Sequence, residues 1–376
     1  MKIIIVGPAY PYRGGIAHFT GLLYKNLVMK NNEVKIFNFK RLYPKFLFPG
    51  KTQFESSTTT EKIESERIID SINPLNWIFT AIKIVKQKPE IVIFKYWLPF
   101  FAPCYGVISA ILKIFSSSEI VFICHNITPH EKFPFGNLLT KFAFLFADRF
   151  IVQSDAVEKD LLKLKPSATY KKVFHPIYEI FGEAIDKDEA RKILGIRPNE
   201  KVLLFFGYIR PYKGLDILLK SVKFIVSKFQ VKVFVVGEFY ENPEKYFKLV
   251  EEEGIGDFVV FVNEYVPNDD VKIYFSACDL VVLPYLSATQ SGIVQIAYNF
   301  NKPVVATNVG GLPEVVYDGL TGFIVDPSPE KIAEAVVKFF NENLGEFFSK
   351  NIEAEKKRFS WENFVNALLA SRTHPS

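Results

Sequence analysis

The sequence has few of the residues from which disulfide frameworks and metal sites are built. Among its 376 residues are five histidines and three cysteines, and the cysteines, Cys104, Cys124 and Cys278, are odd in number and widely separated. No C-x-x-C or H-x-x-x-H pair occurs. A disulfide scaffold is therefore excluded, a reducing compartment is expected, and neither a metal nor another cofactor is predicted.

Long hydrophobic runs are also scarce. The first residues, MKIIIVG, are apolar only as far as Gly7 and Pro8, which favours a first strand over a secretory signal. The uncharged stretch Tyr96–Leu112 is shorter than the ~20 residues of a spanning helix, and Pro99 and Pro103 interrupt it. We interpret it as a strand end, a turn and a core helix. The protein is expected to be soluble and cytoplasmic.

Positive charge is concentrated in the first half of the chain. The net charge is +5, but residues 1–175 contain 24 Lys and Arg against 13 Asp and Glu, whereas the remainder contains 22 against 28. A basic half suggests an anionic partner, such as nucleic acid, lipid headgroups or a phosphorylated substrate, although solvated lysines alone would give the same balance. Nucleic acid is disfavoured because the interleaved arginines and aromatic platforms of such modules are missing.

Apolar strand patterns alternate with amphipathic helical patterns such as Asp216–Phe229. Most strands are continuous Val, Ile and Phe runs, which is typical of parallel sheets buried on both faces. The fold class predicted is α/β, with two doubly wound, Rossmann-like domains in tandem. The expected strands are Lys2–Gly7, Glu33–Phe39, Glu90–Tyr96, Glu119–His125, Asp148–Ser154, Lys201–Ile209, Val231–Gly237, Phe258–Val262, Asp279–Tyr285, Pro303–Thr307 and Phe323–Asp326.

The boundary between the domains is expected near His175–Gly182, and a long insertion, Arg41–Thr60, follows the second strand. Loops of that length are usually functional or disordered. Within Lys40–Phe54, aromatic and aliphatic residues stand beside lysines, as in an interfacial anchor for an anionic membrane surface. The alternative is that the insertion packs on the protein itself.

Ligands in open α/β sheets bind beyond the carboxyl ends of the strands, so the motifs that follow strands are the candidates. Gly14 and Gly15 follow the first strand at the start of a helix, where backbone N–H groups can approach a phosphate. A simple tight turn is the alternative. The pattern is not G-x-G-x-x-G, and the second strand ends in Asn38-Phe39-Lys40 without an acidic residue, which disfavours a dehydrogenase.

A second candidate follows the strand that begins at Lys201, in the sequence FFGYIRPYKGLD. Gly207 permits close approach of the backbone. Arg210 and Lys213 are three residues apart at the junction with the next helix. Two fixed cations there can hold a diphosphate and stabilise charge that develops on it as a leaving group. A solvated helix start is the simpler interpretation.

The most informative segment is Leu283–Pro327, in which a strand leads to a polar turn, a helix, another strand and a Gly-Gly-Leu-Pro-Glu loop. With this segment the chain resembles the retaining glycosyltransferases of the GT-B fold, specifically family 4 (glycosyl transferases group 1). The resemblance covers nearly the whole length, from the Gly-Gly entry and the GYIRPYKG loop to PVVATNVGGLPEVVYDGLTGFIVDP and RFSWENF.

The resemblance implies two domains that face each other across a cleft. Residues 1–177 would form an acceptor-binding domain and residues 178–357 a nucleotide-sugar-binding domain. Residues 358–376 would form a helix that returns to the first domain, which Trp361 would brace. The activity implied is transfer of a hexose from a nucleotide-diphosphate sugar to a glycan or lipid-linked acceptor, in cell-surface polysaccharide or glycolipid synthesis. The location implied is the cytoplasm, with peripheral binding at the inner face of the membrane as an option.

Individual roles carry over by position. Lys213 matches the family's diphosphate-binding lysine, whereas Tyr208 stands where the usual arginine would be, so Arg210 is taken as its substitute on physical grounds. His125, in CHNITPHE, matches the histidine that faces the reacting sugar. The three catalytic candidates are therefore His125, Arg210 and Lys213. The donor-binding candidates are Gly14, Gly15, Gly207, Gly237, Tyr265, Thr289, Gln290, Ser291, Gly292, Gln295 and Glu314.

The sequence departs from the family at two glutamates that are normally seven residues apart. Thr289 stands at the first position, and the second falls near Gln295 or Ile296. Hydroxyl and amide groups there can still hydrogen-bond, but they cannot form the covalent glycosyl-enzyme for which a carboxylate is needed. We therefore expect front-face substitution, in which the leaving diphosphate accepts the acceptor's proton. The rival hypothesis is a catalytically silent sugar-nucleotide-binding protein of the same fold.

Two acidic pairs resemble metal ligands but are better explained as helix starts. Asp186-Lys187-Asp188 precedes a helical pattern, and Asp269-Asp270 follows Pro267. His18 and His130 could line a cleft or be structural, and neither is assigned a role. Cys124 and Cys278 lie in apolar runs and are predicted to be core residues.

Overall fold

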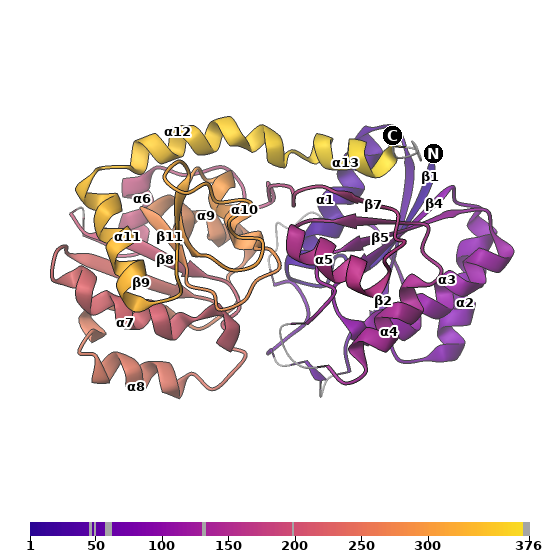
Figure 1. Ribbon diagram of the computed structural model, residues 1–376, viewed down its shortest axis with the longest axis horizontal. Helices are drawn as coiled ribbons and strands as arrows, with labels where there is room; N and C mark the ends of the chain where they lie inside the picture. Colours follow the sequence, from indigo (N-terminus) through magenta and orange to yellow (C-terminus); the bar gives the residue numbers. More distant parts are fainter. Residues whose placement is uncertain (45–46, 49, 57–61, 130–132, 198, 371–376) are drawn as a thin grey trace. The chain divides into compact units, whose positions relative to one another are not determined.

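The structure is a computed structural model that describes residues 1–44, 47–48, 50–56, 62–129, 133–197 and 199–370. These residues form two compact units (Figure 1). The first contains residues 1–55, 62–176 and 359–370, and the second contains residue 56 and residues 177–358. The limits expected from the sequence, 177/178 and 357/358, differ from these by one residue.

The first unit is built on a seven-stranded parallel sheet of order β3-β2-β1-β4-β5-β6-β7. The chain order reverses between β1 and β4. All five strands expected here are confirmed, but two edge strands, β3 and β7, were missed. The strands are β1 (Lys2–Val6), β2 (Glu33–Arg41), β3 (Glu66–Asp70), β4 (Ile91–Tyr96), β5 (Glu119–Cys124), β6 (Arg149–Val152) and β7 (Tyr170–Lys172).

Helices cover both faces of this sheet (Figure 1). α1 (Gly15–Met29) and α13 (Trp361–Leu369) pack together on one face, and α2 (Pro74–Gln87), α3 (Ala102–Phe115) and α4 (Gly136–Phe144) lie on the other. α5 (Asp155–Leu164) connects β6 to β7. As expected for Tyr96–Leu112, β4 is followed by a 3-10 turn and the buried helix α3. No helix among the described residues has the length and apolarity needed to span a membrane.

The C-terminal helix α13 belongs to the first unit, in agreement with its expected return. The rings of Trp361 and Phe364 pack edge-on against Phe19 of α1, with centroids 4.9 and 5.3 Å away. Arg149 at the start of β6 donates a hydrogen bond to the carbonyl of Leu368 at 2.7 Å. These contacts bury the apolar face of α13 against the sheet layer.

The described part of the insertion packs on its own unit. Leu42 is buried, and the Tyr43 ring stacks on Phe100 while its hydroxyl accepts a hydrogen bond from Trp97 at 3.0 Å. Phe54 stacks on Tyr12 at 5.3 Å. Residues 45, 46, 49 and 57–60 of the insertion lie outside the described residues. The contacts favour the alternative in which the insertion covers the protein itself.

The second unit is a six-stranded parallel sheet of order β10-β9-β8-β11-β12-β13, and all six expected strands are confirmed. The strands are β8 (Lys201–Phe206), β9 (Val231–Val236), β10 (Val259–Val262), β11 (Leu280–Leu283), β12 (Val304–Thr307) and β13 (Gly322–Val325). The helices are α6 (Lys187–Ile193), α7 (Leu215–Val226), α8 (Glu244–Glu252), α9 (Asn268–Ala277), α10 (Gly292–Asn299), α11 (Pro329–Asn341) and α12 (Gly345–Glu355).

Both acidic pairs serve as helix starts, as predicted. The Asp186 carboxylate caps α6 by accepting hydrogen bonds from the backbone N–H groups of Asp188 and Glu189 at 2.9 and 3.0 Å. Asp269 and Asp270 lie in the first turn of α9, where their charge complements the helix dipole. Cys124 and Cys278 are fully buried core residues, and burial raises the pKa of the Cys278 thiol to about 11.

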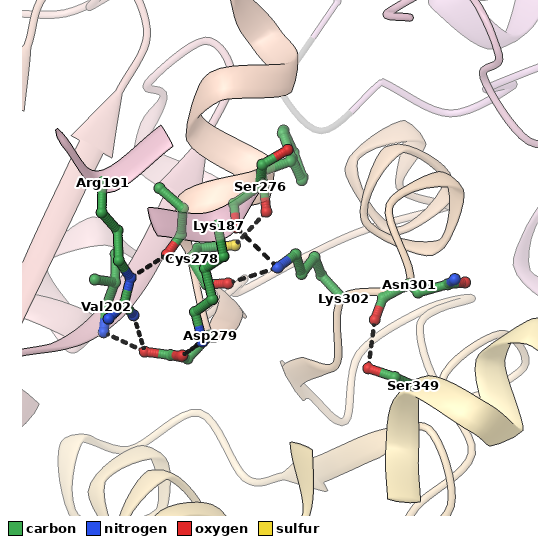
Figure 2. Close-up of polar contacts among 11 residues, drawn as sticks. Lys187, Arg191, Val202, Ser276, Cys278, Asp279, Asn301, Lys302 and Ser349 are labelled. Atoms are coloured by element: carbon green, nitrogen blue, oxygen red, sulfur yellow. Dashed lines mark hydrogen bonds and ion pairs between the residues drawn. The ribbon is translucent and has the colours of Figure 1, made fainter. Parts of the chain in front are cut away.

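A polar network closes the amino edge of the second sheet (Figure 2). Asp279 accepts hydrogen bonds from Lys187, Arg191 and the backbone N–H of Val202, and Lys302 donates to the carbonyls of Ser276 and Cys278. A cavity of about 300 Å³ lies beside this network. Because its cations are already used to hold the starts of β8 and β11, we interpret this network as structural.

Candidate active site at the carboxyl edge of the second sheet

The switch point of the second sheet lies between β8 and β11, where the chain order reverses. The loops that follow these two strands touch. A Cβ atom on Gly214, which has a φ of +62°, would lie only 2.0 Å from the carbonyl oxygen of Pro284. The backbone N–H of Leu286 donates to the carbonyl of Tyr212 at 2.7 Å. The two loops thus form one surface at the position where open α/β sheets bind ligands.

Lys213 is the central cation of this surface. It ends a 3-10 turn, Pro211–Lys213, and only 8% of its surface is exposed. Its Nζ atom lies 3.0 Å from the position that a Cβ on Gly207 would occupy, and the Ile293 side chain of α10 lies 3.1 Å from the same point. Gly207 has a φ of +98°, so a glycine is needed both for the backbone conformation and for the space taken by the ammonium group.

The electrostatics of the surface favour an anion. Burial lowers the pKa of Lys213 to about 7, and the Arg210 guanidinium contributes to this lowering of the pKa. The Arg210 guanidinium lies 4.9 Å from the centre of the Tyr240 ring, and the Lys213 Nζ lies 5.6 Å from that of Tyr285. Within the described residues Lys213 forms no ion pair. A buried cation without a counter-charge is costly, and a bound diphosphate would supply that charge.

The start of α10 contributes backbone donors to the same surface. The Ser291 hydroxyl caps the helix by accepting from the N–H of Ile293 at 3.2 Å. A Cβ on Gly292 would lie 3.1 Å from the Tyr178 ring, which explains the small residue there. Thr289 and Gln290 precede the cap, half-buried. One turn into α10, Gln295 is 1% exposed, and its amide oxygen has no hydrogen-bond partner among the described residues.

Aromatic side chains gather where β8, β9 and β10 end. The Tyr208 ring lies 4.5 Å from the ring of Tyr240 and 6.2 Å from that of Tyr265. The loop after β9 lies close to the end of β8. A Cβ on Gly237 would lie only 2.2 Å from the carbonyl oxygen of Gly207, so a side chain has no room there. Tyr265 and Gly237, predicted from the sequence, are thereby brought to the surface that carries Lys213.

Sequence reasoning missed two residues after β9. Tyr240 contacts both Tyr208 and Arg210, and Glu238 is a buried carboxylate directly after Gly237. Both residues directly follow a strand at the edge where ligands bind, so their position in the sequence is the signal that indicates them.

Glu314 lies in the loop that follows β12. This loop packs on the one that carries Thr289, because a Cβ on Gly310 would lie 1.4 Å from the carbonyl oxygen of Ala288. The backbone oxygen of Glu314 accepts a hydrogen bond from Arg358 at 3.4 Å. The position of its loop is compatible with the expected donor contact.

The remaining candidates belong to the first unit. Gly14, with a φ of 97°, caps α1 without a side-chain hydrogen bond, and Gly15 begins the helix. His125 follows β5 and is buried against Phe19, with ring centroids 4.7 Å apart. Burial and the neighbouring Lys95 hold the pKa of His125 well below its usual range, so the ring is neutral at pH 7. The Nε2 atom of His18 lies 3.4 Å from the Oε2 atom of Glu55. His130 lies outside the described residues.

Comparison with protein families finds a match within the second unit. Residues 186–358 match the family described as glycosyl transferases group 1. A curated relative, the D-inositol 3-phosphate glycosyltransferase of Mycobacterium marinum, is 34% identical over 236 residues, which are 60% of this chain and 50% of the relative. The chain thus spans about half the length of the curated relatives it matches.

Solved structures extend the likeness to both units. HepE from Anabaena, solved in complex with UDP, superposes with a TM-score of 0.75 at 19% identity and covers 98% of this chain and 99% of its own. Sucrose-phosphate synthase from Thermosynechococcus elongatus has a TM-score of 0.72 at 18% identity, with 98% and 97% covered. The chain has the α/β fold of these GT-B glycosyltransferases, with two Rossmann-like sheets.

Proposed function

We propose that the protein is a retaining glycosyltransferase of family 4 that moves a hexose from a nucleotide-diphosphate sugar to a glycan or lipid-linked acceptor. The observation that carries the proposal is that two cationic side chains, buried Lys213 and its neighbour Arg210, lie together at the switch point of the second sheet. Two cations there are suited to a diphosphate. The similarity to glycosyl transferases group 1 supports the same conclusion.

The proposed reaction is front-face substitution. The bond between the sugar C1 and the diphosphate oxygen breaks, and the acceptor oxygen bonds to C1 on the same face. The acceptor's proton passes to the departing diphosphate oxygen, so no side-chain base is needed. Lys213 and Arg210 stabilise the negative charge that grows on the diphosphate, and fixed charges in a poorly solvated site do this effectively.

The other candidates are assigned to donor binding. Backbone N–H groups at Gly14, Gly15, Ser291 and Gly292 would meet phosphate oxygens. Backbone near Gly237 and Tyr265 would contact the base, and Gly207 leaves space for Lys213. The polar groups of Thr289, Gln290, Gln295 and Glu314 would hold hydroxyl groups of the sugar and ribose, and His125 would face the reacting sugar.

A turnover assay tests the activity. We expect release of a nucleoside diphosphate that depends on acceptor and is abolished in Lys213→Ala. The matched control is Lys220→Ala, which removes an exposed lysine from α7 and should leave turnover unchanged. NMR of the product should show the anomeric configuration of the donor. Inversion at C1 would contradict the front-face mechanism even if turnover is observed.

A second candidate function rests on the two positions where the family's glutamates are missing. Because neither Thr289 nor the second position, at Gln295 or Ile296, provides a carboxylate, such a chain would bind sugar nucleotides without transferring the sugar. Binding of a nucleotide sugar together with no turnover across a broad panel of acceptors would support this alternative and exclude the enzyme.

We further propose that transfer needs no metal and no other cofactor. Within the described ranges no three His, Cys, Asp or Glu side chains form a metal-binding group, and lysine and arginine can neutralise the diphosphate. Turnover should therefore survive EDTA. The expected setting is the synthesis of cell-surface polysaccharide or glycolipid, in the cytoplasm or at the inner membrane face, with no nucleic-acid partner.

A further inference from the structure

Helices α2, α3 and α4 of the first unit expose many large apolar side chains. α2 packs against α3 and α3 against α4, so the three form one layer (Figure 1). Scattered exposed hydrophobic residues are normal, but a concentration of them on adjacent elements marks an interaction surface. From 39% to 79% of the surface is exposed for Leu75, Ile78, Phe79, Ile82, Ile114, Phe115, Phe135, Leu138, Phe142 and Leu145.

The spacing of these residues places them in stripes. On α2 the exposed residues Leu75, Ile78, Phe79 and Ile82 follow the pattern i, i+3, i+4, i+7, which is one helix face. A different face of α2, with Trp77, Ala81 and Ile84, is buried in the core. α2 is therefore apolar both toward the core and toward solvent.

α4 shows the same arrangement. Leu138, Phe142 and Leu145 are spaced by four and three residues and are exposed, whereas Thr140, Ala143 and Phe144 are buried. The Phe142 ring also packs on α3 at Gly106. A Cβ on Gly106 would lie only 2.3 Å from that ring. The outward stripes of α2 and α4 thus flank α3, whose last turn exposes Ile114 and Phe115.

The charge on this layer has one sign. The 37 residues of α2, α3 and α4 include four lysines and no aspartate or glutamate. Lys86 follows Ile82 by four residues, and Lys141 follows Leu138 by three, so both continue the apolar stripes. Lys83 and Lys113 pair with Glu66 and Asp148, but Lys86 and Lys141 form no ion pair within the part of the chain that the structure describes.

We infer that the outer face of α2, α3 and α4 docks on an anionic lipid bilayer. Its leucine, isoleucine and phenylalanine side chains would enter the boundary between headgroups and acyl chains, and Lys86 and Lys141 would reach the headgroup phosphates. A second copy of this chain is a poorer occupant, because a two-fold contact of this face with itself would bring lysines against lysines. The surface differs from the insertion Lys40–Phe54, whose described residues pack largely on their own unit.

The inference rests on the proposed function and gives it a membrane partner. An enzyme that acts on a lipid-linked acceptor must bring its acceptor-binding unit to the bilayer surface, and this face lies on that unit. Docking itself needs neither donor nor acceptor. Vesicle binding and donor binding can therefore be measured separately, and one can fail while the other succeeds.

Flotation with vesicles tests the surface. The probes are phosphatidylcholine vesicles with and without phosphatidylglycerol, and the protein is the full chain. The test variants are Leu75→Ser with Phe79→Ser, and Leu138→Ser with Leu145→Ser. The matched control is Ile193→Ser with Phe347→Ser, which removes two exposed apolar side chains from the second unit. All substituted side chains are exposed, so folding, checked by the melting temperature, should be preserved.

We expect the wild-type protein to float with phosphatidylglycerol vesicles, more weakly without that lipid and at high salt. Each test variant should lose about tenfold or more of its vesicle affinity, and the control should lose none. Donor binding should be the same in all variants. Absence of vesicle binding, or binding that persists in both test variants, would overturn the inference. A dimer in light scattering that either test variant dissociates would instead assign the face to self-association.

Discussion

The Nζ atom of Lys95 lies 3.4 Å from the centre of the Phe19 ring, and neither side chain is exposed to solvent. Lys95 is on β4 and Phe19 is on α1. The same ring also packs edge-on against His125 and Trp361. One phenylalanine thus joins the central sheet, the first helix, the C-terminal helix and the histidine assigned to face the sugar.

Replacement of Lys95 by Met should stabilise the protein. The Lys95 amine is fully buried and forms no hydrogen bond among the described residues, and burial holds its pKa well below 10.5. Because an unpaired polar group in the interior is costly, Lys95→Met should raise the free energy of unfolding by about 1–3 kcal/mol. Denaturant titration measures this change in the free energy of unfolding. Lys159→Met, at an exposed lysine, is the control and should change it by about zero.

The increase in the free energy of unfolding caused by Lys95→Met should depend on pH. A lysine whose native pKa is lowered binds more protons in the unfolded state, so the contribution of Lys95 to the free energy of unfolding rises with pH from the native pKa to 10.5. The difference between variant and wild type should therefore be larger at pH 6 than at pH 9. A variant that is less stable than the wild type would show that the contact with Phe19 outweighs the cost of burial.

Gly207→Ala should weaken donor binding beyond its effect on stability. An alanine there must adopt a φ near +98°, and its methyl group would crowd the Lys213 ammonium at 3.0 Å. We expect about 1–2 kcal/mol of lost stability from the backbone and a tenfold or greater loss of nucleoside-diphosphate affinity by calorimetry.

Gly195→Ala separates these two effects. Gly195 also has a positive φ, +66°, but apart from its two chain neighbours no described residue has an atom within 4 Å of the position that an alanine methyl group would occupy. It should lose stability through the backbone alone and keep full affinity. Equal affinity in both alanine variants would mean that the space beside Gly207 is not part of the donor site.

Gln295→Leu tests the polar residue near the position expected for the second glutamate, which falls at Gln295 or Ile296. The amide oxygen of Gln295 is buried and has no hydrogen-bond partner among the described residues, so the free protein should tolerate leucine with unchanged or slightly higher stability. The donor should bind about threefold to tenfold more weakly if that oxygen accepts a ligand hydroxyl. Gln230→Leu, outside the carboxyl edge of the sheet, is the control. Unchanged affinity in Gln295→Leu would remove Gln295 from the site.

Donor binding should be coupled to proton uptake. With a pKa of about 7, Lys213 is largely neutral at pH 8 and largely charged at pH 6 in the free protein. A bound diphosphate favours the charged form. Calorimetry in buffers of different ionisation enthalpy should therefore show uptake of up to about 0.9 proton at pH 8 and little at pH 6. Lys213→Met should abolish the difference; its persistence there would assign the proton to another group.

The sequence was sufficient to predict the whole second sheet and the interior of the first sheet, but not the two edges of the first sheet. Strands buried on both faces are continuous apolar runs, and all eleven strands expected from the sequence are present. β3 (ERIID) and β7 (YKK) lie at the two edges of the first sheet, where charged residues are tolerated, so they left no such run. Lys213 and Gly207 were proposed from the sequence because their motif directly follows a strand pattern, which local sequence reveals, whereas the switch point itself depends on the order of the strands in the sheet.

Burial and exposure could not be predicted from the same patterns. Nothing in EIVIFKY distinguishes Lys95 from a solvated lysine, because its burial depends on α1 and α13, which are distant in sequence. Conversely, nothing local distinguishes Leu75 or Leu138 from a core leucine, whereas the folded chain leaves both outside. Both differences arise because a residue's hydrophobicity does not specify which layer will cover it.

The central claim is that Lys213 and Arg210 bind the diphosphate of the donor. Thermal-shift screening of UDP, GDP and ADP identifies the preferred nucleotide, and calorimetry then gives its affinity for the wild type, Lys213→Met, Arg210→Met and the control Lys220→Met. Since a hydrogen bond to a charged group contributes roughly 1.5–3 kcal/mol, each of the first two variants should bind about 10- to 100-fold more weakly, with the control unchanged. Affinities within twofold of wild type in both variants would contradict the account.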